Sequence, residues 1–425
     1  MKRGFYTIMS AQFFSSLADN ALFVAAVEML RSAGAPQWQP AALVPMFALF
    51  YVVLAPLLGA FSDAQPKGKV MFYANGIKVL GCLMMLFGGH PLISYAFVGL
   101  GAAAYSPAKY GILTELLPTS QLVKANGWIE GLTILSIILG VGLGGQLTGP
   151  KIAPLLLSVH LPLVDFGIHT PAQASIACMV VLYAIAAAFN LRIPRTDAPL
   201  EPLSGKLVEL VRDFSQCNAR LWDDKLGQIS LATTTLFWGV SGNLRYVVLA
   251  WAASALAYST SQASLLLLLV GLGTAVGALV ASATVSLARA TRVIVLGILM
   301  GVLVIAMNAI HNVWIAAPFL LVLGAIGGYM VVPMNALLQH RGHNLMGSGR
   351  SIAVQNFNEQ AAILGLGAFY TGMTRIGLSV FGSITIFGVF VAFTSWMIRR
   401  WHQRNLVHHR EEVEGLLKIA RCDDH

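Results

Sequence analysis

The sequence predicts an all-α membrane protein with twelve transmembrane helices in two six-helix halves. Of its 425 residues, 57% are hydrophobic and only 11% are charged, against roughly a quarter charged in ordinary soluble domains. The apolar residues form long continuous runs, whereas the strands of a membrane barrel alternate over about ten residues. A soluble enzyme and a disordered chain are both excluded, because each needs more charge than this chain carries.

Twelve apolar segments follow one another, each close to the roughly 20 residues that a transmembrane helix needs. The first six lie at about 8–30, 41–60, 70–89, 92–114, 124–149 and 173–193, and the second six at about 228–256, 262–288, 292–310, 313–338, 350–374 and 377–398. We therefore expect an N-terminal half over 1–193, a linker over 194–225, a C-terminal half over 226–401 and a tail over 402–425.

The connections between segments differ in character. In the linker, apolar residues from Leu203 to Leu221 recur at helical spacing, which predicts an amphipathic helix near the membrane surface. The connection over 151–170 is apolar but broken by Pro154 and Pro162, and the sequence does not settle its place.

The net charge of +9 has a topological explanation. Lys and Arg concentrate in the cytoplasmic loops of membrane proteins. With the N-terminus inside, the outer loops hold only Arg31, Lys151 and Arg375, so both termini are predicted to be cytoplasmic. The charge therefore gives little support for binding of nucleic acid.

Several charged residues fall within the apolar segments, where charges are rare and usually functional. They are Asp19, Lys78, Lys109, Glu130, Arg245 and Glu359. Asp19 and Arg245 are expected to face one central cavity from opposite halves and to neutralise each other. For Lys78 two readings stay open: a substrate contact, or a structural ion pair or a lysine reaching toward the surface.

Weak internal matches favour two repeated halves. Asp19-Asn20-Ala21-Leu22 corresponds to Gly242-Asn243-Leu244-Arg245, and Asn126 with Glu130 corresponds to Gln355 with Glu359. This arrangement fits a parallel repeat about an axis normal to the membrane, as in major facilitator transporters.

The stretch from Gly59 through Asp63 to Lys67 resembles the major facilitator loop motif, although Ala64 and Pro66 depart from it. Asp63 at a helix end can pair with cations or with a helix N-terminus of the other half. Glu115 and Lys124 lie on the same predicted side and are expected to join this cytoplasmic gate. The alternative is an ordinary positively charged inner loop.

Two patterns known from soluble enzymes occur in the sequence, but the segments around them do not match the structures that these patterns require. The glycines at 140, 142 and 145 match a nucleotide-binding spacing but lie within one apolar helix, so close helix packing is the better interpretation. His160 and Asp165 match an acyltransferase spacing, but no enclosing domain surrounds them. The cysteine spacings suggest no metal site or disulfide framework, and no cofactor is expected.

Longer stretches resemble the bacterial lysophospholipid transporter family. In the first half these are Ala74-Asn75-Gly76-Ile77-Lys78, Ala104-Tyr105-Ser106-Pro107-Ala108-Lys109-Tyr110-Gly111 and Leu122-Val123-Lys124-Ala125-Asn126-Gly127, and in the second half Leu236-Phe237-Trp238-Gly239 and Val332-Pro333-Met334-Asn335. The resemblance extends over nearly all twelve segments and implies a major facilitator fold.

The resemblance implies a flippase of the bacterial inner membrane that moves lysophospholipids, such as lyso-phosphatidylethanolamine, from the outer to the inner leaflet and catalyses no reaction. A separate acyltransferase on the inner face then restores the second chain. Arg245 and Lys109 are expected to hold the phosphate, and Asp19 or Glu130 to face the ammonium. Hydrogen bonds are expected from Asn20, Tyr105 and Gln355.

Two alternatives remain open at this stage. One is a proton-coupled exporter of drugs or other amphiphiles, with Asp19 or Glu359 carrying the proton. The other is a membrane-bound lipid acyltransferase. We expect a monomer among membrane lipids; the sequence gives neither the head-group preference nor the coupling ion.

Overall fold

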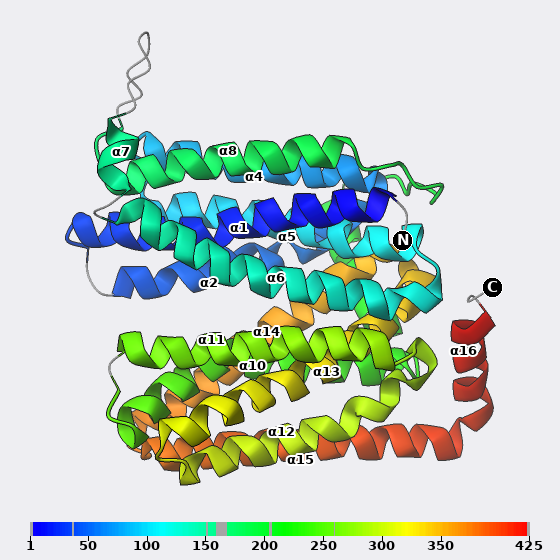
Figure 1. Ribbon diagram of the computed structural model, residues 1–425. Helices are drawn as coiled ribbons and strands as arrows, with labels where there is room; N and C mark the ends of the chain where they lie inside the picture. Colours follow the sequence, from blue (N-terminus) through cyan, green and yellow to red (C-terminus); the bar gives the residue numbers. More distant parts are fainter. Residues whose placement is uncertain are drawn as a thin grey trace. The chain divides into compact units, whose positions relative to one another are not determined.

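The computed structural model describes residues 3–35, 38–149, 152–158, 168–203, 206–258 and 260–422. Within these ranges every regular element is a helix (Figure 1). The chain divides into two compact units. Unit 1 comprises Met1–Leu116, Leu135–Asp213 and Ser348–Ala353, and unit 2 comprises Leu117–Ile134, Phe214–Gly347 and Val354–His425.

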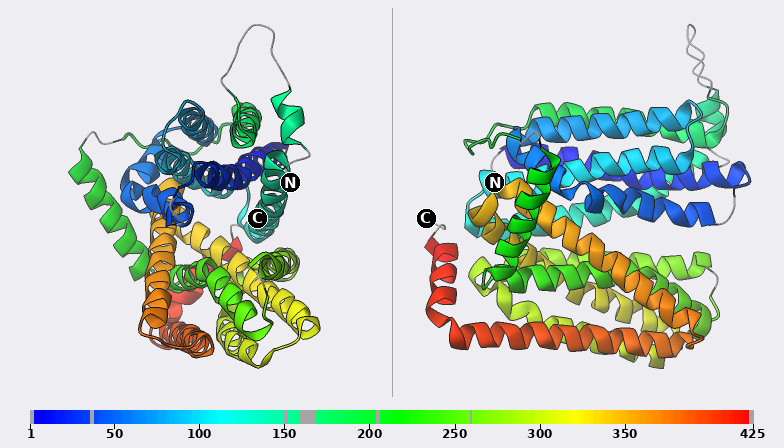
Figure 2. Two further views of the ribbon diagram at one scale, coloured as in Figure 1. Left: turned by 90° about the vertical axis from the view of Figure 1, so that its left-hand side faces the viewer. Right: turned by 180° about the vertical axis from the view of Figure 1, so that it is seen from behind.

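Unit 1 is built from the helices of the first half. They are α1 (Arg3–Ser32), α2 (Trp38–Val53), α3 (Ala55–Ala64), α4 (Lys67–Leu86), α5 (Pro91–Leu116), α7 (Ala153–Leu157) and α8 (Pro171–Leu191). α4 packs against α5 and α8, α1 packs against α8, and α2 packs against α5. Figure 2 shows these helices side by side in both views. Apolar side chains of α1, α2, α4, α5 and α8 form its core.

Unit 2 is built mainly from the helices of the second half. They are α10 (Gly227–Ala255), α11 (Thr260–Thr284), the 3-10 helices η1 (Leu287–Ile294) and η2 (Met307–Ala309), α12 (Val295–Ala306), α13 (Val313–Met346), α15 (Val380–His408) and α16 (Arg410–Cys422). α11 packs against α13 and α12 packs against α15. α9 (Leu207–Asp223) connects the two sets of helices along the chain.

Two helices contribute to both units. α6 (Thr119–Thr148) belongs to unit 2 up to Ile134 and to unit 1 from Leu135. α14 (Ser348–Arg375) belongs to unit 1 up to Ala353 and to unit 2 afterwards. Gly347, which separates α13 from α14, has φ +86° and lets the chain turn within one residue.

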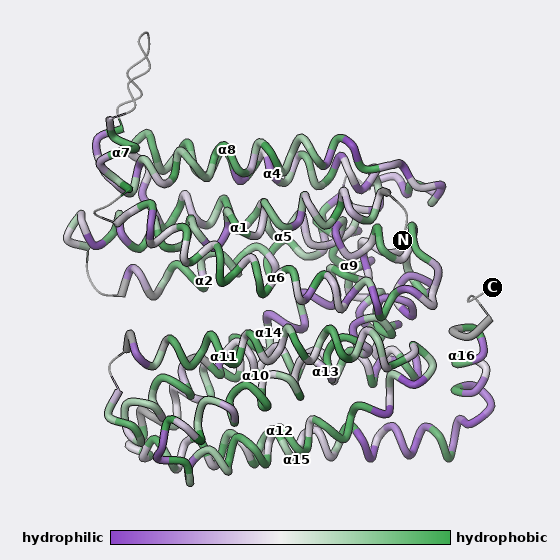
Figure 3. The backbone as a smooth tube through the Cα atoms, in the orientation of Figure 1, coloured by the Kyte–Doolittle hydropathy of each residue, from purple (hydrophilic) through white to green (hydrophobic). Residues whose placement is uncertain are grey.

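The twelve expected segments each correspond to one helix or one run of helices. By length and composition, eight described helices are able to cross a membrane, and a ninth if α2 and α3 count as one span. Figure 3 shows the hydrophobic residues running along these helices. The expected single span over 41–60 is bent by 63° between α2 and α3. Pro56 lies in the first turn of α3 and has no amide hydrogen to continue the helical ladder.

Small residues let neighbouring helices approach closely. A Cβ on Gly140 would lie 2.6 Å from the carbonyl oxygen of Leu17, and a Cβ on Gly144 would lie 2.7 Å from that of Ala21. Gly277 is tighter, since its Cβ would lie 1.9 Å from the carbonyl oxygen of Ala325. The packing interpretation is confirmed for Gly140, whereas a Cβ on Gly142 or Gly145 would meet no atom within 4 Å.

The expected amphipathic segment of the linker contains α9. Leu210, Cys217 and Leu221 of this helix are buried, whereas Leu207 and Val208 are exposed. Of the connection over 151–170, the structure describes α7 and the residues from 168 onward; His160, Pro162 and Asp165 lie outside the described residues.

Candidate functional site

Unit 1 holds a polar cluster among apolar helices, which we call the Asp19 cluster: Ser15, Asp19, Asn75, Lys78 and Tyr183. Lys78 Nζ donates to Asp19 Oδ2 at 2.8 Å and to Ser15 Oγ at 3.0 Å. Tyr183 donates its hydroxyl to Asp19 Oδ1 at 2.7 Å. Ser15 in turn donates to Asn75 Oδ1 at 2.8 Å. Ser15 and Asp19 are four residues apart on α1, so both face the same neighbours.

Asp19 has a cationic partner within unit 1, which is Lys78. The expected neutralisation by Arg245 stays a prediction. A carboxylate among apolar helices needs a cation. Lys78 of α4 provides it, with its ammonium at hydrogen-bonding distance from Asp19. Arg245 belongs to α10, and its side chain lies outside the described residues.

Burial is unequal within this ion pair. The Lys78 side chain is 2% exposed and that of Asp19 is 20% exposed. The rings of Tyr105 and Tyr183 lie 5.2 Å and 5.4 Å from Lys78 Nζ, so two aromatic faces also stabilise the ammonium. Lys78 is thus enclosed, and the carboxylate is the more accessible member of the pair.

Other residues predicted to contact substrate in unit 1 have varied surroundings. Asn20 donates to the carbonyl of Ser16 in its own helix at 2.8 Å. The buried hydroxyl of Tyr105 makes no hydrogen bond within the described part of the chain. Lys109 is buried on α5, with Nζ 4.1 Å from the centre of the Tyr110 ring.

In unit 2 two of the predicted residues, Gln355 and Glu359, are hydrogen-bonded to each other. Gln355 donates through Nε2 to Asn335 Oδ1 at 3.0 Å and to Glu359 Oε1 at 2.7 Å. Glu130 is buried on the part of α6 that belongs to this unit. Nearby on α6, Asn126 exchanges two hydrogen bonds with Gln339 of α13, at 2.8 Å and 2.9 Å.

The residues predicted to form a gate meet in unit 1, except one. Lys67 Nζ lies 2.7 Å from Asp63 Oδ1 and 3.5 Å from Glu115 Oε1, and all three side chains are buried. We call these three residues, with Arg350, the Asp63 cluster. Lys124 is exposed, belongs to unit 2, and makes no ion pair with any described residue.

Asp63 also binds the start of α14. Its Oδ1 accepts from the backbone amide of Gly349 at 2.7 Å and its Oδ2 accepts from that of Arg350 at 2.9 Å. These amides have no partner inside the helix, and the helix dipole favours an anion there. Both kinds of contact expected of Asp63 are present; a role in gating stays a prediction.

Two glycines make this approach possible. A Cβ on Gly349 would lie 2.5 Å from Asp63 Oδ1, and a Cβ on Gly59 would lie 2.7 Å from that of Ala353. Gly59 is the glycine of the loop motif, so the motif supplies both the close approach and, four residues later, the anion.

Sequence reasoning missed several members of these clusters. The sequence does not single out Arg350, yet its Nε donates to Asp213 Oδ2 at 2.7 Å and it also pairs with Glu201. Ser348 donates to Glu115 Oε1 at 2.6 Å. Tyr183 is a hydroxyl-bearing residue within an apolar segment, and such a residue is a sign in the sequence that a polar partner lies nearby.

Across the described ranges, no group of three or more His, Cys, Asp or Glu side chains is placed to hold a metal ion.

Solved structures show the same fold. The fucose:proton symporter FucP of E. coli aligns with a TM-score of 0.70 and 10% identity, covering 93% of this chain and 98% of that one. The human organic anion transporter MFSD10 aligns with a TM-score of 0.68 and 14% identity, covering 94% and 100%. At these identities the likeness concerns the fold alone.

Sequence relatives are closer. The lysophospholipid transporter LplT of Photorhabdus laumondii is 36% identical over 408 residues, covering 95% of this chain and 98% of the relative. That of Yersinia enterocolitica is 37% identical over 381 residues, covering 89% of each. The family model of the Major Facilitator Superfamily matches residues 8–366. This multi-pass membrane protein therefore belongs to the major facilitator superfamily and, within it, to the lysophospholipid transporter family.

Proposed function

We propose that the protein carries lysophospholipids from the outer to the inner leaflet of a bacterial inner membrane. The observation that carries this proposal is the identity to lysophospholipid transporters of 36% over 95% of the chain. Transport makes and breaks no covalent bond, so the protein acts as a flippase and not as an enzyme.

The Asp19 cluster supports a cargo with a zwitterionic head. The Asp19–Lys78 pair carries no net charge, so unit 1 keeps an ionic group among apolar helices at limited cost. Since the carboxylate is the more exposed partner, it is suited to meet an ammonium. The phosphate then requires cations elsewhere, and Lys109 and Arg245 are the candidates that the sequence offers.

The Asp63 cluster supports an inner gate. Asp63 holds the first turn of α14, whose remaining turns belong to unit 2. Breaking this contact releases the start of α14 from Asp63 of α3. With the termini cytoplasmic, as the distribution of Lys and Arg predicts, the cluster lies on the inner side.

A functional partner follows from the cargo. A lysophospholipid that reaches the inner leaflet has one acyl chain, and an acyltransferase on that face restores the second. In this proposal the acyltransferase is a separate protein and the transporter works as a monomer.

Uptake of labelled lyso-phosphatidylethanolamine into spheroplasts, with and without an uncoupler, tests the proposal. We expect inward movement at matched expression and no new diacyl lipid when the purified protein receives an acyl donor. Outward movement that the uncoupler abolishes would indicate a proton-coupled exporter, and new diacyl product would indicate an acyltransferase.

Two double variants test the site. Asp19→Asn with Lys78→Met removes both charges together, so no buried ion is left unpaired, and we expect folded protein without uptake. Asp224→Asn with Arg341→Gln removes a second buried ion pair, whose atoms are 2.6 Å apart in unit 2, and serves as the matched control. Uptake at the normal rate in the first variant contradicts the head-group role of Asp19.

A further inference from the structure

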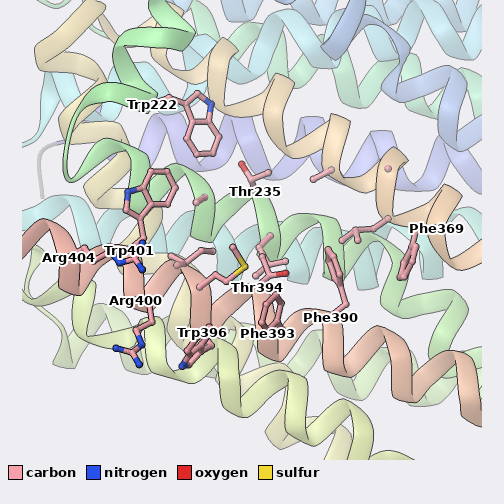
Figure 4. Close-up of a pocket in the computed structure, with 17 residues that line it drawn as sticks. Trp222, Thr235, Phe369, Phe390, Phe393, Thr394, Trp396, Arg400, Trp401 and Arg404 are labelled. Carbon is pink, nitrogen blue, oxygen red and sulfur yellow. The ribbon is translucent and has the colours of Figure 1, made fainter.

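Unit 2 contains a large groove that the transport proposal does not use. Its volume is about 1160 Å³, and Figure 4 shows its lining residues on α9, α10, α14 and α15. This volume exceeds the roughly 300–1,000 Å³ of typical small-molecule pockets. The groove therefore has room for a ligand as large as a lipid.

The lining is polarised from one end to the other. Phe369, Phe390 and Phe393 line one end, and Arg400 and Arg404 gather with Trp222 and Trp401 at the other (Figure 4). Small and apolar side chains such as Ala362, Gly365 and Leu366 also line the groove. Charge at one end and hydrocarbon along the rest match the chemistry of a phospholipid.

The two arginines are suited to bind an anion. They are four residues apart on α15 and so lie on one face of the helix. The Arg400 guanidinium lies 5.4 Å from the centre of the Trp396 ring, and among the ion pairs of the described residues neither arginine has a carboxylate partner. The nearby Asp224 is bound by Arg341. No acid lines the groove in the part of the chain described, so its charged end is purely basic.

Tryptophans mark the boundary between the two parts. Trp222 of α9 and Trp401 of α15 stack with ring centres 6.3 Å apart and an angle of 7° between planes. Trp side chains are enriched where hydrocarbon meets the head-group region. Their place beside the arginines agrees with a phosphate at this end and acyl chains along the apolar part.

We propose that this groove binds an anionic diacyl phospholipid of the surrounding membrane, with the phosphate on Arg400 and Arg404 and the chains against α10, α14 and α15. Guanidinium groups bind phosphate through two parallel hydrogen bonds. Basic pockets between transmembrane helices recognise anionic head groups. The site belongs wholly to unit 2, and it holds a resident lipid in addition to the transported cargo.

Native mass spectrometry of the full chain, purified in detergent with dioleoyl-phosphatidylglycerol or dioleoyl-phosphatidylcholine, tests the head group. The anionic lipid should stay bound in preference. Arg400→Gln with Arg404→Gln should weaken it about 25-fold, since about 1 kcal/mol per arginine is about fivefold. Arg399→Gln, an exposed neighbour that does not line the groove, should leave binding unchanged.

A second pair of variants tests the chain region. Gly365 lines the groove and a Cβ there meets no atom within 4 Å, so we expect Gly365→Phe to fold and to occupy space in the groove. Gly372, seven residues along α14, has the same free space but does not line the groove, so Gly372→Phe is the matched control. The anionic lipid should be lost only from Gly365→Phe.

Three results overturn the proposal. Equal retention of the two lipids would show an ordinary hydrophobic surface. Unchanged binding in both groove variants would place the lipid elsewhere. Displacement of the lipid by equimolar lyso-phosphatidylglycerol or by glycerol phosphate would show a cargo site or a plain phosphate site. Because uptake is not the readout, the result is independent of whether the transport proposal holds.

Discussion

The connection between α3 and α4 and the connection between α11 and α12 take equivalent places in the two halves, but they are held differently. The first carries the buried Asp63–Lys67 pair and binds the start of α14. The second forms η1, where Leu287, Ala290, Val293 and Ile294 are buried and Arg289 and Arg292 are exposed. One connection is stabilised by charge and the other by apolar packing. The acid in the last turn of α3 is what binds the distant N-terminus of α14.

Asp63→Ala should have the largest effect on this contrast. It leaves Lys67 buried with only the more distant Glu115 as anion and leaves two amides of α14 unpaired. Breaking a buried pair costs about 3–5 kcal/mol. Thermal unfolding in detergent should fall clearly, and cysteine labelling near Ser348 should rise. Unchanged labelling and uptake would show that Asp63 is an ordinary charged residue with no role in holding α14.

Gly349→Ala should weaken the same anchor through its shape. The new Cβ would overlap the Asp63 carboxylate, and crowding of this kind costs about 1–3 kcal/mol. The labelling change should resemble that of Asp63→Ala while the buried charges stay intact. Gly415→Ala, which meets no atom within 4 Å, is the control. Equal stability of both variants would mean that α14 can shift without cost.

Ser286→Asp tests whether an acid alone makes the connection between α11 and α12 behave like the one between α3 and α4. Ser286 precedes η1 and makes no side-chain cap bond. An aspartate there should raise stability by less than about 1 kcal/mol through local capping. Uptake should not change, because η1 is held by apolar contacts. A large change in uptake would show that the two connections are interchangeable.

Arg289→Gln with Arg292→Gln should have the smallest effect. Both side chains are exposed, and substitutions at such positions usually change stability by less than about 0.5 kcal/mol. Unfolding and uptake should match the unaltered protein. A loss of uptake at normal stability would assign these arginines a function that their exposure does not suggest.

The sequence predicts the helices well, because long apolar runs have few alternatives in a membrane. It also predicts the kind of partner that Asp63 finds, since an acid beside a helix end favours amides and cations. It does not identify Gly349 and Arg350 as those partners, because they are about 290 residues away and nothing local encodes the contact.

Asp19 shows the same limit more clearly. Its need for a cation follows from its place in an apolar segment, but the contact with Lys78 depends on how α1 and α4 are rotated about their axes. Rotation of a helix changes which of its side chains meet a neighbouring helix. Tyr183 and Asn75 complete the cluster by this geometry, which an isolated hydrophobic pattern does not contain.

The long separation between Asp63 and α14 bears on how the chain is made. Gly349 follows Asp63 by 286 positions, so the ribosome completes α10 to α13 of the second half before the anchor has its partner. Lys67 is only four positions from Asp63 and is present from the start. Unit 1 therefore inserts with its acid already neutralised by a neighbour, and it becomes complete only when the start of α14 arrives.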